Sequence, residues 1–214
     1  MSRMRVDHVS YAAEVDGLKA TSRRLAKKLG VMPVDGGIHP RFGTRNIILP
    51  LAHDRYVEVV EVLDHPASDK APFGQAVRAR SELGGGWLGW VVRVEDLSEA
   101  EQRLGRQAAA GSRRRPDGVE LKWRQLGIKG LMADPELPFY VQWDDQSPHP
   151  SAGATTDVTI SGLQIAGDPE RVCKWLGLPA GQTSNFIDFT FVAPHGTAGL
   201  LAVTFQTPRG PVTI

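Results

Sequence analysis

The stretch VDHVSYAAEVDGLKATSRRLAKKLGV, residues 6–31, decides the fold, because two periodicities follow each other within it. As far as residue 13, alternate side chains divide into an apolar face and a face that carries His8 and Ser10, which is typical of a strand. After Asp16, which can cap a helix, apolar positions recur every three or four residues as far as Gly30. We therefore predict a strand over residues 5–13, a corner at Asp16 and a helix that ends before Gly30.

The same strand, Asp corner and helix return twice, at residues 88–104 around Asp96 and at residues 158–178 around Asp168. Each of the first two copies is followed by further strand-like segments, which predicts a duplicated βαβββ module. One helix for several strands indicates the α+β class. We expect paired βαβββ modules that form a cupped mixed sheet with helices on its convex face, and a partial third βαββ module at the C-terminus. The expected boundaries are 1–63 for the first module, 64–84 for a linker that could hold a short helix, 85–150 for the second module and 151–214 for the third, all within one globular unit.

Composition limits the classes of function. The chain has 214 residues and a net charge of +1, so it has no overall attraction to nucleic acid or to an anionic membrane. Cys173 is its one cysteine, so no intrachain disulfide can form, and a reducing cytoplasm is the expected location. No apolar run approaches the ~20 residues that span a bilayer, and the N-terminus shows no apolar signal segment. We expect a cytoplasmic protein that binds a small molecule and neither nucleic acid nor membrane, and that could form a homodimer.

His8 and Glu58 are the first candidates for a site. His8 lies in the middle of the opening strand, and Glu58 lies in the middle of a predicted strand over residues 56–63. A buried charge without a partner costs on the order of several kcal/mol, so we expect the two side chains to lie together on the cup face. Imidazole and carboxylate are ordinary ligands of divalent metals, but they are equally an ordinary hydrogen-bonded pair. A purely structural role for His8 stays open.

The chain resembles the glyoxalase-like members of the vicinal oxygen chelate superfamily. The resemblance is carried by DHVSYA (7–12), GGIHPRFGTRNIILPL (36–51), YVEVVEV (56–62), GWLGWVVRVEDL (86–97), SRRRPDGVELKW (112–123), LPFYVQWD (137–144) and the C-terminal TFQTPRGPVTI (204–214). It implies two βαβββ modules with a pocket between them. It also implies that a metal, where one is used, is held by the first and last strands of each module.

Carried over by position, these ligands are His8, Glu58, Gly89 and Gln142, where Gly89 has no donor and Gln142 is a weak one. The resemblance thus implies one divalent metal ion (Zn, Ni, Mn or Fe) at His8 and Glu58. A catalytic metal usually has three protein ligands. His39 could supply a third if its Gly-rich loop folds over the cup, although it could equally be a turn residue.

Two functions compete. In the first, the protein is an enzyme in which His8 and Glu58 are catalytic. They either hold a metal that acts as a Lewis acid or, without a metal, one of them acts as a general base. The reaction would be that of a lyase, an isomerase or a ring-cleaving dioxygenase on a small oxygenated metabolite. The second is a metal-free protein that binds or sequesters a small molecule. For either, the expected substrate-binding residues are His39, Asn46, Arg93, Trp123, Gln142 and Trp143. Arg93 could hold a carboxylate or could instead pair with Glu95 or Asp96.

The remaining histidines, His53, His65, His149 and His195, are expected at the surface, and Arg113, Arg114 and Arg115 are expected in a solvated turn.

Overall fold

The computed structural model describes residues 4–146, 148–179, 187–193 and 196–214. Two βαβββ modules follow each other, as predicted. The first comprises β1 (Arg5–Ala12), α1 (Leu18–Leu29), β2 (Val34–His39), β3 (Thr44–Leu51) and β4 (Arg55–Val62). The second comprises β5 (Gly86–Arg93), α4 (Ser98–Leu104), β6 (Ala109–Arg114), β7 (Glu120–Leu126), the 3-10 helix η1 (Ile128–Gly130) and β8 (Phe139–Trp143).

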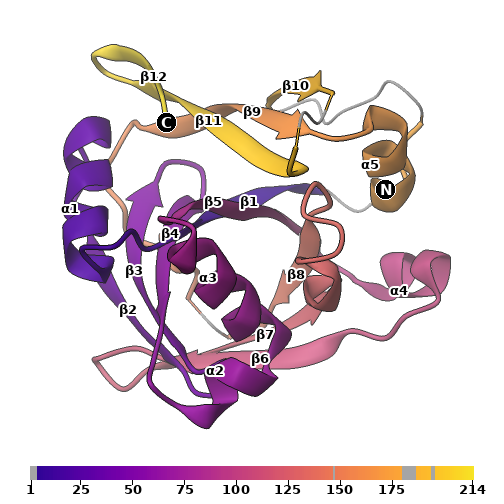
Figure 1. Cartoon of the computed structure of the whole chain (residues 1–214), viewed down its shortest axis with the longest axis horizontal. Helices are drawn as coiled ribbons and strands as arrows, with labels where there is room; N and C mark the ends of the chain where they lie inside the picture. The colour runs from indigo at the N-terminus through magenta and orange to yellow at the C-terminus, as the bar shows by residue number, and fades with distance from the viewer. Residues whose placement is uncertain (1–3, 147, 180–186, 194–195) are drawn as a thin grey trace.

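The two sheets join at both ends, so the predicted cup closes into an eight-stranded barrel with the strand order β1-β4-β3-β2-β6-β7-β8-β5 (Figure 1). The β1–β5 ladder is antiparallel and runs along both strands, whereas β2 and β6 meet through the pair Ile38 and Arg114. Within each module the first and last strands are parallel, which makes the sheet mixed, as expected. The strands β2 and β6 were not predicted, because their Gly-rich and Arg-rich sequences indicate turns.

The predicted linker is more than a connection. It holds two helices, α2 (Pro66–Lys70) and α3 (Pro72–Glu82), and α3 packs into the mouth of the barrel. Its Phe73, Ala76 and Val77 form a buried cluster with inward-facing residues such as Val60 and Val91. In Figure 1, α3 lies in the middle of the ring of strands. Helix α1 instead packs on the outside, against β3 and β4, as expected for the convex face.

The C-terminal segment opens like a module but pairs its strands differently. It comprises β9 (Thr159–Ala166), α5 (Pro169–Leu176), β10 (Asp188–Val192), β11 (Gly199–Thr207) and β12 (Gly210–Thr213), in the sheet order β10-β9-β11-β12. The strand parallel to β9 is β10, the one that directly follows the helix. In both modules the strand parallel to the first is the last. The third copy therefore shares the strand–helix corner with the modules but has its own topology.

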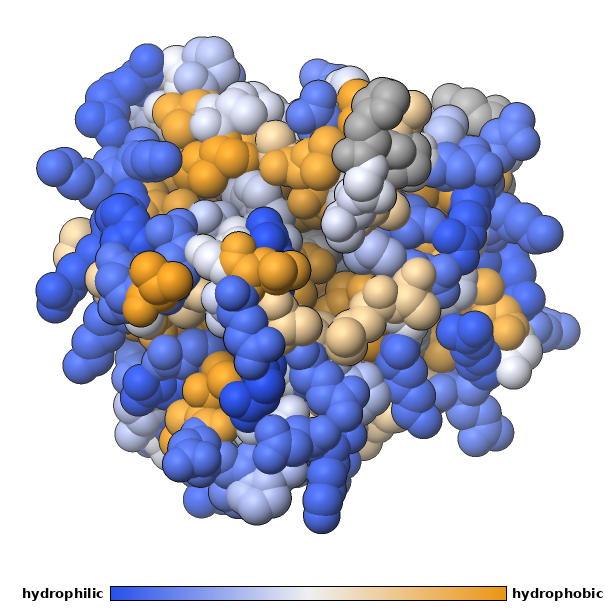
Figure 2. Space-filling model, in the orientation of Figure 1, coloured by the Kyte–Doolittle hydropathy of each residue, from blue (hydrophilic) through white to orange (hydrophobic). Residues whose placement is uncertain are grey.

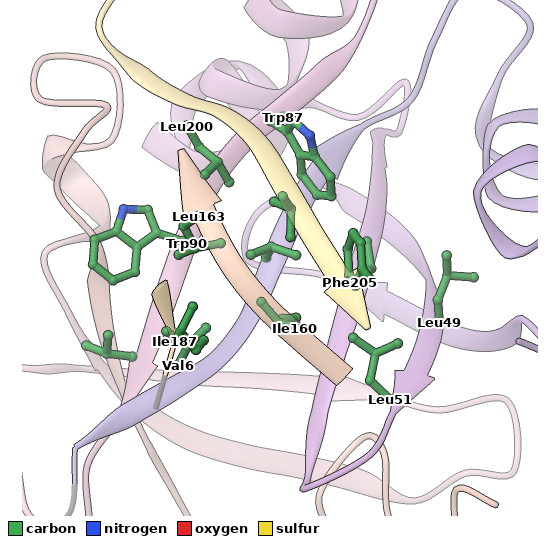
Figure 3. Packing of buried hydrophobic residues seen from close by; sticks show 14 of the residues in the cluster. Val6, Leu49, Leu51, Trp87, Trp90, Ile160, Leu163, Ile187, Leu200 and Phe205 are labelled. Atoms are coloured by element: carbon green, nitrogen blue, oxygen red, sulfur yellow. The ribbon is translucent and has the colours of Figure 1, made fainter. Parts of the chain in front are cut away.

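This C-terminal sheet covers the outer face of the barrel at the junction of the modules. Val6 of β1 and Trp90 of β5 lie in one buried cluster with Ile160, Leu163 and Phe205 of the sheet (Figure 3). The barrel therefore has two cores: a large one under the C-terminal sheet and α1, and a smaller one inside, under α3. The inner core adjoins a cavity that the charged residues Glu58 and Arg113 help to line.

Figure 2 shows apolar residues over the upper and central part of this face, interrupted by hydrophilic ones, and hydrophilic residues along most of its rim. Among the described residues, no helix has the length and apolar character needed to cross a membrane.

Candidate functional site

The candidate site is a cavity inside the barrel, closed on one side by α3. Its polar wall carries His8, His39, Tyr56, Glu58, Arg113 and Gln125; its apolar wall carries Phe42, Phe73, Trp123, Ile128, Phe139, Val141 and Trp143. The centres of water molecules can occupy about 30 Å³ of it. That is space for a ligand of only a few non-hydrogen atoms, unless a wall moves. Small, mostly apolar cavities with a few polar groups are typical of small-molecule sites.

His8 reaches this cavity from β1 and is fixed on two sides. Its Nδ1 lies 2.7 Å from Oδ1 of Asp7, and its ring stacks on Tyr56 at 4.4 Å between centroids. Val6 pairs with Val92 of β5 and His8 pairs with the adjacent Val91, so Asp7 has no partner on β5. This β-bulge places the side chains of both Asp7 and His8 on the inside. His8 therefore lines the cavity, and the carboxylate that it contacts is that of Asp7.

Asp7 is a fully buried carboxylate with several donors. Its Oδ2 accepts hydrogen bonds from Nε1 of Trp143 and Nε2 of His149, both at 3.1 Å, and Nε of Arg93 lies 3.8 Å away. Burial raises the pKa of Asp7, but the hydrogen bonds and charges of His149 and His8 outweigh it and hold the pKa well below its usual range. Because an ionised carboxylate only accepts, the proton of the His8 bond is on Nδ1, which leaves Nε2 for a ligand.

Glu58 forms a second polar centre on β4. Ser10 donates to its Oε2 at 2.9 Å, Asn46 donates to its Oε1 at 2.7 Å, and Nε2 of His39 lies 3.8 Å from Oε1. Burial raises the pKa of Glu58, but His39, His8, the Asn46 hydrogen bond and Arg113 together lower it below its ordinary value. Glu58 is therefore an anion at neutral pH, held by neutral donors.

His39 is a neutral imidazole on β2. It is 4% exposed, and burial lowers its pKa to about 4, although Glu58 acts in the opposite direction. Its Nδ1 lies 3.2 Å from Oγ1 of Thr44. The predicted role of His39 as a cup residue fits this position, while the predicted loop is in fact the β2–β3 hairpin.

Arg113 was expected in a solvated turn, and the structure corrects this. It lies on β6, is 3% exposed, and donates from Nη1 to Oδ1 of Asn46 at 3.1 Å. Its neighbour Arg114 faces outward and is exposed. The sequence does not show which of the three successive arginines faces inward. A strand is recognised by polar and apolar residues that alternate, and three identical residues show no such alternation.

Most of the predicted site residues come together, and two do not. His8, His39, Glu58, Trp123 and Trp143 line the cavity, and Asn46 lies directly behind Glu58. Arg93 does not line the cavity but lies at the rim, where it contacts Asp7 and, at 3.6 Å, Asp54.

Gln142 does not line the cavity either. Its Oε1 accepts from the backbone of Leu97, on the outer side of β8. The prediction matched the tyrosines of YVEVV and YVQWD, but Tyr56 faces the cavity whereas Tyr140 packs outward and donates to Trp175. A shift of one residue moves every side chain of a strand to the opposite face.

His149 also departs from the prediction of a surface histidine. Its side chain is 9% exposed and contacts Asp7, Tyr56 and Trp143. His149 follows the last strand of the second module, and its local sequence does not predict this contact, because the contact depends on how the chain returns across the barrel. His53 and His65 are exposed as predicted, and His195 lies outside the described residues.

A three-ligand metal site does not fit these residues. In the second module the inward positions are Gly89 and Val91 on β5 and Phe139 and Val141 on β8, which carry no donor atoms. Within the described part of the chain, no three His, Cys, Asp or Glu side chains are placed to hold a metal ion. Both oxygens of Glu58 already accept hydrogen bonds, which a metal ion would have to replace. Metal binding by His8 and Glu58 therefore stays a prediction.

Comparisons with known proteins agree with the resemblance. The model of the family described as a glyoxalase-like domain matches residues 6–178, more than three quarters of the chain. A hypothetical protein from Staphylococcus aureus has a similar structure, with a TM-score of 0.74 and 14% identity over 97% of this chain and 93% of that one. Comparison with curated proteins finds no match.

Two enzyme structures share parts of the fold more weakly. A methylmalonyl-CoA epimerase from Streptomyces coelicolor covers 67% of this chain and 96% of its own, with 14% identity and a TM-score of 0.44. A mutant 4-hydroxymandelate synthase from Streptomyces coelicolor covers 100% of this chain and 62% of its own, with 12% identity and a TM-score of 0.46. The family match over both modules decides the assignment: the chain belongs to the glyoxalase-like domain family of the vicinal oxygen chelate superfamily.

Proposed function

We propose that this protein binds a small oxygenated metabolite inside the barrel and moves a proton on it, as an isomerase or a lyase, with His8 as the group that takes up the proton. The observation that carries the proposal is the Asp7–His8 pair at the cavity wall. A buried carboxylate fixes one nitrogen of the imidazole and leaves the other to accept a proton, an arrangement used for general base catalysis.

The proton would come from a carbon next to a carbonyl group. The C–H bond breaks, its proton goes to Nε2 of His8, and its electron pair moves to the carbonyl oxygen to form an enolate. The buried charge of Arg113 favours the negative oxygen, because electrostatic effects are strong in an enclosed cavity. Glu58 is a poorer base, since its three neighbours stabilise its ionised form.

A specific observation also supports the alternative, a binding protein without chemistry. The part of the cavity wall contributed by β8 is apolar, with Phe139, Val141 and Trp143, and the ring of Trp123 packs beside it. Such a wall can hold a ligand without reacting with it. Binding and proton transfer are separated by the experiment below.

The experiment follows hydrogen exchange in D₂O. The protein is incubated with small 2-oxo and 2-hydroxy acids and their amides, and NMR records loss of the C–H signal next to the carbonyl. We expect exchange with the native protein, a fall of at least about 100-fold in the Asp7→Asn and His8→Gln variants, and no change after EDTA treatment. The exposed His53→Asn is the matched control.

Three results would count against proton transfer by His8. Equal exchange rates in native protein and His8→Gln would rule out His8 as the base. Loss of exchange with EDTA, together with a stoichiometric metal in elemental analysis, would favour the metal-dependent alternative. Quenching of tryptophan fluorescence by a ligand that shows no exchange would favour the binding protein.

A further inference from the structure

We propose that Arg113 is the anchor for a carboxylate group of the ligand, so that the site takes small monocarboxylic acids, such as 2-oxo or 2-hydroxy acids, in preference to neutral molecules of the same shape. This inference rests on the proposed function of the cavity and names the substrate class. It is carried by the position of a buried guanidinium at the cavity wall whose donors are incompletely used.

Arg113 has few partners for a buried cation. Within the described residues its guanidinium makes one hydrogen bond, from Nη1 to Asn46, and its Nε has no hydrogen-bond partner. The amide of Asn46 lies between it and Glu58, since Asn46 accepts from Arg113 and donates to Glu58. A guanidinium has five N–H donors in a planar fork that matches a carboxylate, so most of its capacity stays available.

The backbone around Arg113 is shaped to hold it in this place. A Cβ atom on Gly36 would lie 2.1 Å from Oδ1 of Asn46 and 2.8 Å from Nη1 of Arg113. Any side chain at position 36 would therefore displace the pair. On β6 itself, a Cβ on Gly111 would lie 2.4 Å from the ring of Trp123. Thus β2 has a glycine where Arg113 packs, and β6 has a glycine where the indole ring of Trp123 packs.

The remainder of the wall explains why the acid must be small. Opposite the polar residues lie Phe73 of α3 and Phe139 and Trp143 of β8, which exclude water from the guanidinium. An ion pair strengthens in such an environment, whereas a neutral amide would leave Arg113 with Glu58, on the far side of Asn46, as its counter-charge. With space for only a few non-hydrogen atoms, an acid held at Arg113 would place the carbon that gives up the proton near His8, which lines the same cavity.

The test measures binding of matched probes by tryptophan fluorescence, since Trp123 and Trp143 form part of the wall. Pyruvate and lactate are compared with pyruvamide and lactamide, which have the same shape without the charge. We expect the native protein to bind the acids at least about 10-fold more tightly than the amides. In Arg113→Gln the acids should lose about 10- to 100-fold in affinity, the range for hydrogen bonds to charged groups, while the amides change little.

Arg114→Gln is the matched control, because it removes the same charge from the next position on β6, where the side chain is exposed. It should bind like the native protein. Arg113→Lys serves if Arg113→Gln does not fold: it keeps the charge but lacks the fork, so it should retain part of the preference for acids.

Equal affinities for acids and amides in the native protein, or an unchanged preference in the Arg113 variants, would overturn the carboxylate anchor and leave the proposed function intact. Absence of a response to any of the four probes, at concentrations that saturate small-molecule sites, would overturn both. A fall in affinity of equal size for acids and amides in Arg113→Gln would assign Arg113 to packing and overturn the anchor.

Discussion

His8 and His39 show how neighbouring histidines acquire different chemistry from their contacts. His8 lies beside the carboxylate of Asp7, which fixes its tautomer with the proton on Nδ1, and its side chain lines the cavity. His39 lies beside Thr44, with Glu58 at 3.8 Å, and burial keeps it uncharged. The first can exchange a proton with a ligand, whereas the second serves as a neutral neighbour of an anion.

The buried His39 predicts a pH dependence of stability. Above pH 6.5 the imidazole is neutral in both the folded and unfolded states, so pH has no effect through it. As the pH falls through 6.5, the unfolded chain takes up a proton that the folded protein does not accept until about pH 4. We therefore expect the free energy of unfolding to fall by about 3 kcal/mol across this range.

Urea unfolding at a series of pH values measures this fall, and His39→Gln should remove most of it. The exposed His53→Asn should keep it. The carboxylates with lowered pKa values, Glu58 and Asp7, lose their contributions only below their ordinary pKa values of 4.5 and 3.8, so their effects begin at lower pH. An unchanged pH profile in His39→Gln would contradict the assignment.

At this scale the sequence predicts residues that stand out from a pattern, and it misses residues that only the tertiary fold brings in. His8 and Glu58 are polar positions inside apolar strands, which is why they could be found. Asp7 looked like the start of a strand, and its burial depends on a bulge against β5 that no local pattern shows. His149 is brought to Asp7 from 142 positions along the chain.

Among the elements, β2 determines how the polar wall is built. It is short, carries two adjacent glycines and pairs with β3, so that it brings His39 to Glu58 and leaves space for Arg113 at Gly36. The glycines indicate a turn in the sequence, because glycine weakens an ordinary strand. At Gly36 the reason for glycine is the close approach of the side chains of Asn46 and Arg113, which come from the strands on either side of β2.

We predict that Gly36→Ala separates Asn46 from Arg113, since the added Cβ would overlap Oδ1 of Asn46. The expected cost is about 1–3 kcal/mol in the free energy of unfolding, with weakened binding of any ligand held by Arg113. Gly130→Ala in η1 is the matched control: the nearest atom to its Cβ would be 3.8 Å away, so stability should hardly change. Urea unfolding and fluorescence titration measure the two effects, and native-like behaviour of Gly36→Ala would show that the pair can shift without loss.

The element order of the modules follows from the sequence because the strand–Asp–helix pattern recurs in it. Asp168 caps its helix as that pattern predicts, whereas α1 follows Gly17 and α4 follows Leu97 without a side-chain cap. The sequence does not predict which residues of β8 face the cavity, because a short strand of apolar and aromatic residues fits either register. Only the pairing of Val91 with Phe139 and of Trp123 with Trp143 shows that Gln142 faces outward. The helix α3 was missed as a wall of the site for a related reason: its contacts with β4 and β5 are tertiary.

On the scale of the whole molecule, the C-terminal sheet stabilises the junction on which the site depends. The strand β1, which carries His8, and its partner β5 turn their outer faces to this sheet. Trp87 of β5 donates to the backbone oxygen of Ile214 at 2.8 Å, and Ala52 donates to that of Val158 at 2.8 Å. The modules and the third copy are therefore expected to unfold together.

Phe205→Ala tests this coupling. Phe205 is 0% exposed and lies in the cluster with Trp90 and Leu163, so truncation should lower the free energy of unfolding by about 3–5 kcal/mol. Leu201→Ala on the same strand is the control, since Leu201 is 47% exposed and should cost little. Tryptophan fluorescence reports on both cores and far-UV circular dichroism reports on the sheets, so coincident transitions in urea would indicate one cooperative unit. Separate transitions, with the barrel still binding its ligand after the C-terminal sheet has unfolded, would show instead that the two modules hold the Asp7–His8 pair in place without this cover.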